Sequence, residues 1–471
     1  MTMDFPDTAS SGRLAQDGVR PWPVGLFVFR GDTPTEAKAL MGEARGLCDA
    51  AVGGTAAAGA DAAAVEAADN ALDPALWDLA RRLARHGEGG PVQYAIVAGG
   101  PDELSAALDA VRHDRKDKGV YPLMPVEGQV AFLFPGQGSQ RVNMAAGLFA
   151  AFPRMRRLLD AFPEYGPVLF PPAAQTPAEE RAQRAAITDT RNAQPLLGLV
   201  DLAIAELLRD LGLAADMVAG HSYGELPALC FAGVLAPEDL LPTSRLRAQS
   251  VLAALGPDPG RMAAVRADGA AVAALLAGVG DVWAVNLNAP QQTVVAGTSA
   301  GIEAFLGRLE AAGVSASGLD VACAFHSPLL REAEGLFAEV LKDVAFSKAG
   351  LPVWSNTTAE RYPEDPEAIK RRLAEHLVGP VRFVEETERM YDEGARVFVE
   401  AGPGTVLTGL AKRILGRREA VLIQTEREGT EAVAFLLHAL ARYLSTGRDL
   451  HLDRLFESHG TAFSPDDTEV R

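Results

Sequence analysis

Residues 218–235 read VAGHSYGELPALCFAGVL and carry the pattern Gly-x-Ser-x-Gly around Ser222. A short apolar run ends at Gly220 and a helical pattern begins at Glu225, which predicts a strand, a tight turn and a helix. The flanking glycines permit the sharp backbone of such a turn. Ser222 would then be exposed beside the N–H groups of a helix N-terminus, which favour an oxyanion. The pattern predicts a nucleophilic serine, and the alternative is a serine in a turn without chemical function.

Length and charge restrict the classes of function. The chain has 471 residues, enough for two or three domains. Its net charge of −18 argues against a nucleic-acid partner, whose phosphates would be repelled. No apolar stretch near the N-terminus predicts a signal peptide, and no run of about 18 apolar residues predicts a membrane span. We expect a cytoplasmic protein with neither a nucleic-acid nor a membrane partner.

The cysteines do not predict a metal site. They are scattered and follow no metal-ligand spacing: Cys48, Cys230 and Cys323. We expect them to be reduced core thiols, as in a cytosolic protein. We expect neither a metal ion nor a permanently bound cofactor.

Alternating helix and strand patterns predict an α/β protein. The expected core is hydrolase-like, with a mostly parallel sheet flanked by helices, over residues 126–260 and 326–427. A ferredoxin-like βαββαβ subdomain is expected over residues 261–325, its last strand formed by SGLDVACAF (317–325). The flanking regions are a disordered polar tail (1–20), a small α/β module (21–125) and a C-terminal helix with a linker (428–471). The Ala/Gly-rich stretch 51–71 is expected to be loop plus helix.

A serine nucleophile needs a base, and His326 is the downstream candidate. It follows the apolar run CAF (323–325), so we expect it at a strand end and therefore at a sheet edge. The sequence FPGQGSQ (134–140) predicts a second strand-to-loop turn, which could offer another oxyanion N–H.

Two other classes of protein compete with this interpretation. A triad hydrolase would need an acid between Ser222 and His326, and Asp281 and Asp320 lie there. A Ser–Asp dyad could use Asp268. A non-catalytic docking or scaffold domain would lack a nucleophile or a base, and this chain has both candidates.

Four motifs together resemble one family. FPGQGSQ (134–140), GHSYGE (220–225), CAFHSP (323–328) and EAGPGTVLTGL (400–410) occur in the order seen in malonyl-CoA:acyl carrier protein transacylases. The same set marks the acyltransferase domains of polyketide and fatty acid synthases. The similarity covers about residues 130–427. The preceding module resembles a ketosynthase–acyltransferase linker, and RPWPVGLFVFRG (20–31) resembles iterative enediyne and polyunsaturated fatty acid synthases.

The resemblance implies a reaction. Malonyl units would pass from malonyl-CoA to the phosphopantetheine thiol of an acyl carrier protein through a malonyl-serine intermediate. Ser222 would be the nucleophile and His326 the base, oriented by the backbone carbonyl of His376. The backbone N–H groups of Gln137 and Tyr223 would form the oxyanion hole. The implied partners are a carrier protein domain and an adjacent ketosynthase, and the alternative is a thioesterase-like editing hydrolase on the same fold.

The resemblance also implies a specificity pocket. Arg247 would bind the malonyl carboxylate through its planar guanidinium, which lysine does not reproduce. Phe325 would fill the space that a methyl branch on the α-carbon requires, and His221 would line the pocket. Tyr223 and Cys323 depart from the residues usual in the family, which bears on the choice of substrate.

Overall fold

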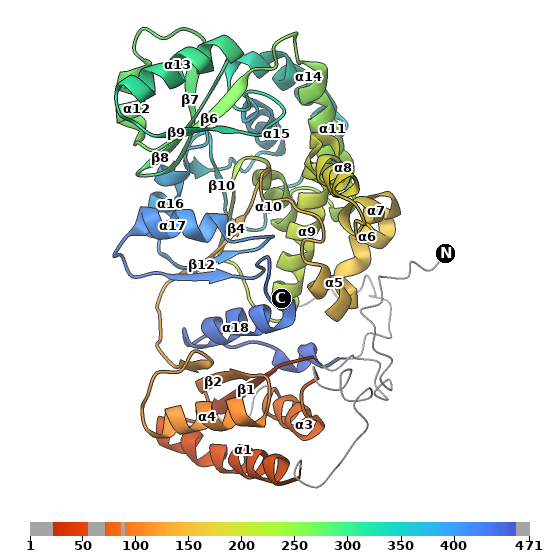
Figure 1. Cartoon of the computed structure of the whole chain (residues 1–471), viewed down its shortest axis with the longest axis vertical. Coiled ribbons are helices and arrows are strands. Elements are labelled where there is room, and N and C mark those ends of the chain that lie inside the picture. The colour runs from red at the N-terminus through yellow and green to blue at the C-terminus, as the bar shows by residue number, and fades with distance from the viewer. Residues whose placement is uncertain (1–21, 55–70, 86–89, 458–471) are drawn as a thin grey trace.

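The computed structural model describes residues 22–54, 71–85 and 90–457. The expected disordered tail (1–20) and most of the Ala/Gly-rich stretch lie outside these described residues. Figure 1 shows three tiers, with a small subdomain at the top, the central sheet in the middle and an N-terminal module at the bottom.

The central sheet has the strand order β11-β10-β5-β4-β12-β13. Neighbouring strands are parallel except for β11, which pairs antiparallel with β10. The strand bounds, in sheet order, are β11 (Glu360–Arg361), β10 (Val353–Ser355), β5 (Met217–Gly220), β4 (Gln129–Phe134), β12 (Ala395–Glu400) and β13 (Val421–Gln424). The expected mostly parallel sheet is therefore present.

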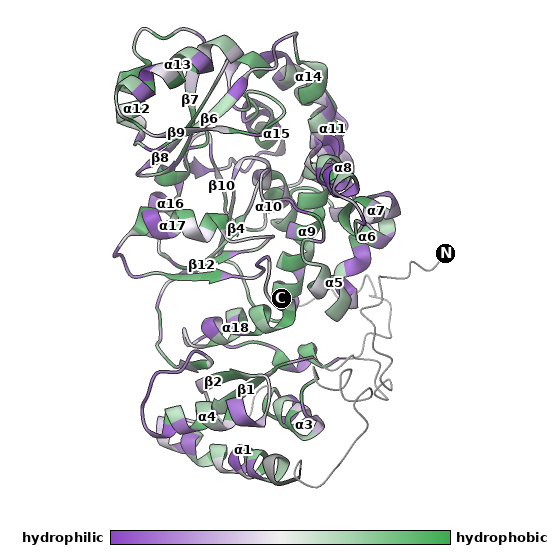
Figure 2. Ribbon diagram, in the orientation of Figure 1, coloured by the Kyte–Doolittle hydropathy of each residue, from purple (hydrophilic) through white to green (hydrophobic). Residues whose placement is uncertain are grey.

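Helices cover both faces of this sheet, and its strands are therefore buried on both sides. On one face, Phe132 and Val218 pack with α9 (Thr190–Asp210), α10 (Glu225–Phe231) and α11 (Pro237–Ala253). On the other, Leu133 and Phe398 pack with α16 (Phe383–Asp392) and α17 (Val406–Leu415). In Figure 2, α9 is largely hydrophobic and α8 (Pro177–Thr188) largely hydrophilic, which matches the burial of α9 and the exposure of α8.

The inserted subdomain has the expected βαββαβ order. Its antiparallel sheet has the strand order β7-β8-β6-β9. The elements are β6 (Arg261–Val265), α12 (Gly269–Leu276), β7 (Val282–Ala289), β8 (Gln292–Gly297), α13 (Ser299–Ala311) and β9 (Ala316–Leu319). The ferredoxin-like prediction is confirmed, but the predicted extent of the last strand is wrong. Strand β9 ends at Leu319, and the chain to Phe325 is irregular.

The N-terminal module contains a three-stranded antiparallel sheet, β1 (Gly25–Arg30), β2 (Val92–Ala98) and β3 (Val120–Pro122). Helices α1 (Pro34–Gly54), α3 (Pro74–Leu83) and α4 (Pro101–Arg112) pack on it. Helix α18 (Ala432–Leu444) lies between this module and the core (Figure 1).

The remaining helices and short 3₁₀ turns connect these elements. They are α5 (Ala146–Ala151), α6 (Arg157–Ala161), α7 (Gly166–Leu169), α14 (Arg331–Lys342) and α15 (Pro366–Glu375), with short 3₁₀ turns η2 (Pro153–Arg156), η3 (Pro163–Tyr165), η4 (Ser222–Gly224), η5 (Pro328–Leu330) and η6 (Leu452–Leu455).

Candidate active site

Ser222 lies on the predicted strand–turn–helix. Strand β5 ends at Gly220, the turn η4 begins at Ser222 and α10 follows from Glu225. The φ angle of Ser222 is 53°, in the left-handed region that residues other than glycine seldom adopt. A Cβ atom at Gly220 would overlap the backbone of Gly224, and one at Gly224 would overlap the carbonyl of Phe134. The motif glycines are therefore required by close backbone packing.

The structure brings Ser222 and His326 together. The Oγ atom of Ser222 lies 2.5 Å from Nε2 of His326. Nδ1 of His326 lies 3.0 Å from the carbonyl oxygen of His376 and 3.1 Å from that of Gly379. Because carbonyl oxygens only accept, Nδ1 carries the proton and Nε2 is left to accept from the serine hydroxyl. The expected carbonyl of His376 is therefore in place, together with a second carbonyl that the sequence did not indicate.

The predicted backbone setting of His326 is wrong. His326 does not end a strand, because β9 stops at Leu319 and His326 lies in a turn with φ 60°. The residues of CAF (323–325) are buried or half-buried, which explains their apolar character. They pack in irregular structure and form no strand. The imidazole is still delivered to Ser222, by a turn rather than by a strand end.

Burial keeps His326 in its neutral form. Burial, and then the positive charge of Arg247, lower the pKa of His326 to about 3. The carbonyls of His376 and Gly379 oppose this shift because they favour the protonated ring. At neutral pH the ring is therefore uncharged and able to accept a proton.

Arg247 is a buried charge close to this pair. It lies on α11 and its residue is only 2% exposed, whereas Arg245 on the same helix is exposed. Burial lowers the pKa of Arg247 to about 10, so the guanidinium stays charged at neutral pH. Within the described part of the chain, Arg247 makes no salt bridge; its guanidinium carbon lies 5.8 Å from the centre of the Tyr223 ring. A buried unpaired guanidinium favours an anionic partner.

Tyr223 links the turn to the helix that carries Arg247. Its hydroxyl lies 2.7 Å from Oγ of Ser244, which donates to the carbonyl of Leu240 at 2.6 Å. A Cβ atom at Gly198 of α9 would collide with this hydroxyl. The tyrosine side chain is therefore packed between α9 and α11, while its backbone remains in the turn.

The turn at residues 134–140 packs against the Ser222 turn. A Cβ atom at Gly136 would overlap the carbonyl of His221 and lie 3.4 Å from the backbone nitrogen of Tyr223. The Gln137 side chain is held by Thr190 at 3.2 Å and Gln194 at 3.3 Å. The segments bearing the two predicted oxyanion donors, Gln137 and Tyr223, are therefore adjacent.

The remaining residues of the predicted pocket are His221, Phe325 and the neighbouring Cys323. Nε2 of His221 lies 2.8 Å from Oδ1 of Asn288 on β7, so His221 joins the core to the inserted subdomain. Burial lowers the pKa of His221. Phe325 is half-buried beside His326. Cys323 is fully buried and burial raises its pKa to about 12, which gives it no thiolate character at neutral pH.

The acids required by the rival hydrolases do not contact this site. Asp268, Asp281 and Asp320 are all exposed, and Asp268 caps α12 by accepting from the N–H of Ala271 at 2.7 Å. Nδ1 of His326 is bonded to carbonyls instead. Within the described residues, no carboxylate occupies the place of a triad acid.

A buried polar cluster that the sequence did not predict lies behind Ser222. Its members are Glu225, Asn356, Tyr362 and Glu386, with the His376 side chain beside them. The available signal was the position of Asn356, which directly follows a buried strand at the carboxyl edge of the sheet.

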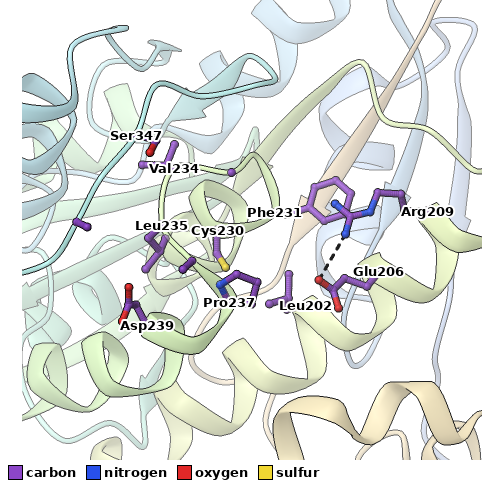
Figure 3. Close-up of a pocket in the computed structure, with 13 residues that line it drawn as sticks. Leu202, Glu206, Arg209, Cys230, Phe231, Val234, Leu235, Pro237, Asp239 and Ser347 are labelled. Atoms are coloured by element: carbon purple, nitrogen blue, oxygen red, sulfur yellow. Dashed lines mark hydrogen bonds and ion pairs between the residues drawn. The ribbon is translucent and has the colours of Figure 1, made fainter. Parts of the chain in front are cut away.

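A cavity of about 390 Å³ lies elsewhere, at the C-terminal end of α10 (Figure 3). Leu202, Glu206, Arg209 and Cys230 line it, and Arg209 lies 3.4 Å from Glu206. None of the predicted site residues contributes to it. Ser222 stands at the opposite end of the same helix, so this cavity is separate from the site.

The described ranges contain neither a metal-binding cluster nor a membrane-spanning helix. No group of three or more His, Cys, Asp or Glu side chains there is arranged to hold a metal ion. Nor is any helix in those ranges long and apolar enough to cross a membrane.

Comparisons with known proteins show the family of this chain. Residues 131–449 match the family model described as acyl transferase domain. The chain is 36% identical over 301 residues to the malonyl CoA-acyl carrier protein transacylase of Bacillus subtilis (strain 168), covering 63% of this chain and 93% of that protein. It is 33% identical over 377 residues to the spectinabilin polyketide synthase system protein NorB of Streptomyces orinoci, covering 78% of this chain but only 17% of that protein.

Solved structures of acyltransferase domains have the same fold as this chain. The acyltransferase domain from the second module of the salinomycin polyketide synthase superposes with a TM-score of 0.69 at 30% identity. The match covers 85% of this chain and 94% of that domain. The expected α/β fold, with its parallel sheet and small antiparallel subdomain, is therefore that of known acyltransferase domains.

Proposed function

Because the chain belongs to the acyl transferase domain family, we propose that it loads malonyl units from malonyl-CoA onto the phosphopantetheine thiol of an acyl carrier protein. The observation that carries this proposal is the Ser222–His326 contact of 2.5 Å. A buried Arg247 without a salt bridge in the described part of the chain lies close enough to depress the pKa of His326.

In the first half-reaction, Oγ of Ser222 attacks the thioester carbonyl while Nε2 of His326 takes the hydroxyl proton. The resulting oxyanion is stabilised by the backbone N–H groups of Gln137 and Tyr223. The carbon–sulfur bond then breaks, and coenzyme A leaves with the proton from His326. The product is a malonyl ester of Ser222.

In the second half-reaction, the pantetheine thiol of the carrier gives its proton to His326 and attacks this ester. The ester bond breaks, the malonyl group is left on the carrier, and Ser222 regains its proton. His326 can serve in both directions because the carbonyls of His376 and Gly379 keep the same tautomer throughout.

Arg247 supplies the selectivity for a carboxylated acyl group. A bidentate guanidinium–carboxylate pair would satisfy a buried charge that forms no salt bridge among the described residues. It would also offset the positive charge that lowers the pKa of His326. An acetyl group would leave Arg247 unpaired at a cost of about 2–5 kcal/mol. Phe325 and His221 form the wall near the α-carbon, and Phe325 disfavours a methyl branch.

The surrounding regions suggest a synthase context. We assign residues 21–125 to a ketosynthase–acyltransferase linker and residues 428–471 to a post-acyltransferase linker, next to a ketosynthase of the same synthase. We assign the chain to iterative enediyne or polyunsaturated fatty acid synthesis because the sequence of residues 20–31 resembles that of such synthases. The described cysteines are all buried and free, which fits work in the reducing cytoplasm.

The test is a transfer assay with malonyl-CoA and a phosphopantetheinylated carrier protein. Intact-mass measurement of the carrier should show a malonyl adduct that forms faster than free malonate. Arg247→Ala should reduce this adduct while leaving the protein folded. Release of malonate without any malonyl-carrier would contradict the proposal and favour the editing hydrolase.

A further inference from the structure

Asn356 lies behind the Ser222 turn, and both polar groups of its side chain make hydrogen bonds. It follows β10 and is completely buried. Its Oδ1 atom accepts the backbone N–H of Ser222 at 2.7 Å. Its Nδ2 group donates to the carbonyl of Gly220 at 2.7 Å and to Oε2 of Glu386 at 2.6 Å. Three elements that meet at the site, β5, η4 and α16, therefore converge on one side chain.

The backbone of Asn356 extends this connection. Its N–H donates to Oε1 of Glu225 at 2.5 Å, and its carbonyl accepts the N–H of Arg382 at 3.0 Å. Tyr362 donates to the other oxygen of Glu225, which also lies 3.1 Å from Nδ1 of His376. Asn356 therefore joins the Ser222 turn to the segment whose carbonyls orient His326.

The contact with Ser222 meets a specific need. Ser222 is the first residue of η4, so no carbonyl of that turn can accept its N–H. Its φ angle of 53° is one that residues with side chains adopt only when the surroundings enforce it. The Asn356 side chain supplies the acceptor, and its two donor contacts fix the amide so that Oδ1 faces Ser222.

We propose that Asn356 is a positioning residue for acyl transfer, holding Ser222 in its left-handed conformation with Oγ within reach of His326. It touches neither Oγ nor Nε2, so it acts through the backbone of Ser222. The proposal rests on the proposed function for its relevance to malonyl transfer, but the positioning itself can be measured without a malonyl donor.

Substitutions of Asn356 should separate the roles of its atoms. Asn356→Ala removes the acceptor for Ser222. Asn356→Asp retains an acceptor but replaces the donor with a carboxylate oxygen facing Gly220 and Glu386. Adding Glu386→Gln restores a donor across that contact, since the side-chain amide introduced at position 386 can donate to the new carboxylate. The double variant should therefore recover part of what Asn356→Asp loses.

The experiment uses a fluorophosphonate, which labels an activated serine. Oγ of Ser222 forms a bond to phosphorus, fluoride leaves, and His326 accepts the hydroxyl proton. Intact mass gives both the labelling rate constant and the final labelled fraction. Loss of folded protein lowers the fraction, whereas misplacement of Oγ lowers the rate constant. Malonyl-CoA acylation is measured in parallel.

We expect Asn356→Ala and Asn356→Asp to lower the labelling rate constant by about 100-fold, the effect of a misplaced reacting group. The double variant should be at least about tenfold faster than Asn356→Asp alone. The matched control is Asn192→Ala, which truncates an asparagine whose amide donates to the carbonyl of Ala186 at 2.8 Å and not to the Ser222 turn. It should label at the parental rate.

An unchanged rate constant in Asn356→Ala would overturn the proposal, even with a reduced labelled fraction. If fluorophosphonate labelling follows the expected order but no variant, nor the parent, accepts malonyl, the positioning role stands and the proposed donor is wrong.

Discussion

Ser222 and His326, 104 residues apart in sequence, face each other at 2.5 Å from two left-handed backbone positions, with φ angles of 53° and 60°. Such conformations cost about 1–3 kcal/mol each for residues other than glycine. They persist here because the surrounding contacts determine them: Asn356 accepts from the backbone of Ser222, and two carbonyls accept from the ring of His326.

The pH dependence of acylation should lack the usual histidine limb. Since the pKa of His326 is lowered to about 3, the base is already neutral at pH 5. We expect kcat/KM for acylation by malonyl-CoA to stay level from pH 8 down to about pH 5, with the fall at lower pH. Arg247→Ala removes a neighbouring positive charge and should move this fall to higher pH. A limb near pH 6.5 in the parent would contradict the buried, neutral base.

The same burial makes the contribution of the histidines to stability depend on pH. His221, His326 and His376 all have pKa values lowered by burial, so the unfolded chain binds protons that the folded chain does not. Their contribution is fully present above the unfolded value of about 6.5 and is lost as the pH falls below it. Burial raises the pKa of Glu225 to about 8 and that of Glu400 to about 7, so these carboxyls change stability in the opposite direction over the same range. Chemical denaturation at pH 7 and pH 5 measures the sum, in which the histidines contribute a fall in the free energy of unfolding toward pH 5. His376→Asn should reduce that fall.

Substitution of Arg247 should alter the choice of donor. Arg247→Ala loses a charge-assisted pair worth about 2–5 kcal/mol, so kcat/KM for malonyl-CoA should fall at least about 30-fold. Acetyl-CoA has no carboxylate to lose, and its kcat/KM should stay level or rise. The exposed Arg245 on the same helix offers a matched control, since Arg245→Ala should leave both donors unaffected. Equal losses for malonyl and acetyl donors would show that Arg247 does not bind the carboxylate.

Phe325 should limit branching at the α-carbon. Phe325→Ala opens space beside His326, and a methyl group in such a pocket is worth about 1–3 kcal/mol. We expect the preference for malonyl-CoA over methylmalonyl-CoA to fall about 10- to 100-fold in competition assays read by intact mass. An unchanged ratio would place the branch-excluding wall elsewhere.

Gly198 should be intolerant of a side chain for a reason that can be reversed. A Cβ atom there collides with the hydroxyl of Tyr223, so Gly198→Ala should lower the free energy of unfolding by about 1–3 kcal/mol. Tyr223→Phe removes that hydroxyl, and Ser244 keeps its bond to Leu240. In urea denaturation, the double variant should therefore be more stable than Gly198→Ala alone. Strictly additive losses would rule out the contact as the cause.

Local sequence was enough to predict the turn at Ser222. The sequence of apolar strand, glycine, serine, glycine and helix has one compact solution, and the structure shows why Gly220 and Gly224 are needed. The βαββαβ insert was also predictable, because its strands and helices alternate with clear breaks. His326 was predicted as the base from its place after an apolar run, and Arg247 was identified from the resemblance. The structure places both in the buried interior.

The strand predicted before His326 was wrong, and the polar cluster behind Ser222 was not predicted. Both depend on long-range packing. The run before His326 is apolar because it is buried, not because it is a strand, and apolarity alone does not distinguish the two. Asn356, Glu225 and Glu386 are polar residues whose burial depends on partners up to 137 positions away in sequence, and no local pattern reveals such partners. Their effect appears only when β5, β10 and α16 are assembled.

The most direct test of the account is the intact mass of the protein after brief mixing with malonyl-CoA, with Ser222→Ala in parallel. We expect a malonyl adduct on the parent protein that maps to Ser222. The adduct should be absent from Ser222→Ala and should disappear from the parent when a phosphopantetheinylated carrier is added. Rapid release of coenzyme A with no adduct on the parent, or an adduct that persists in Ser222→Ala, would contradict it.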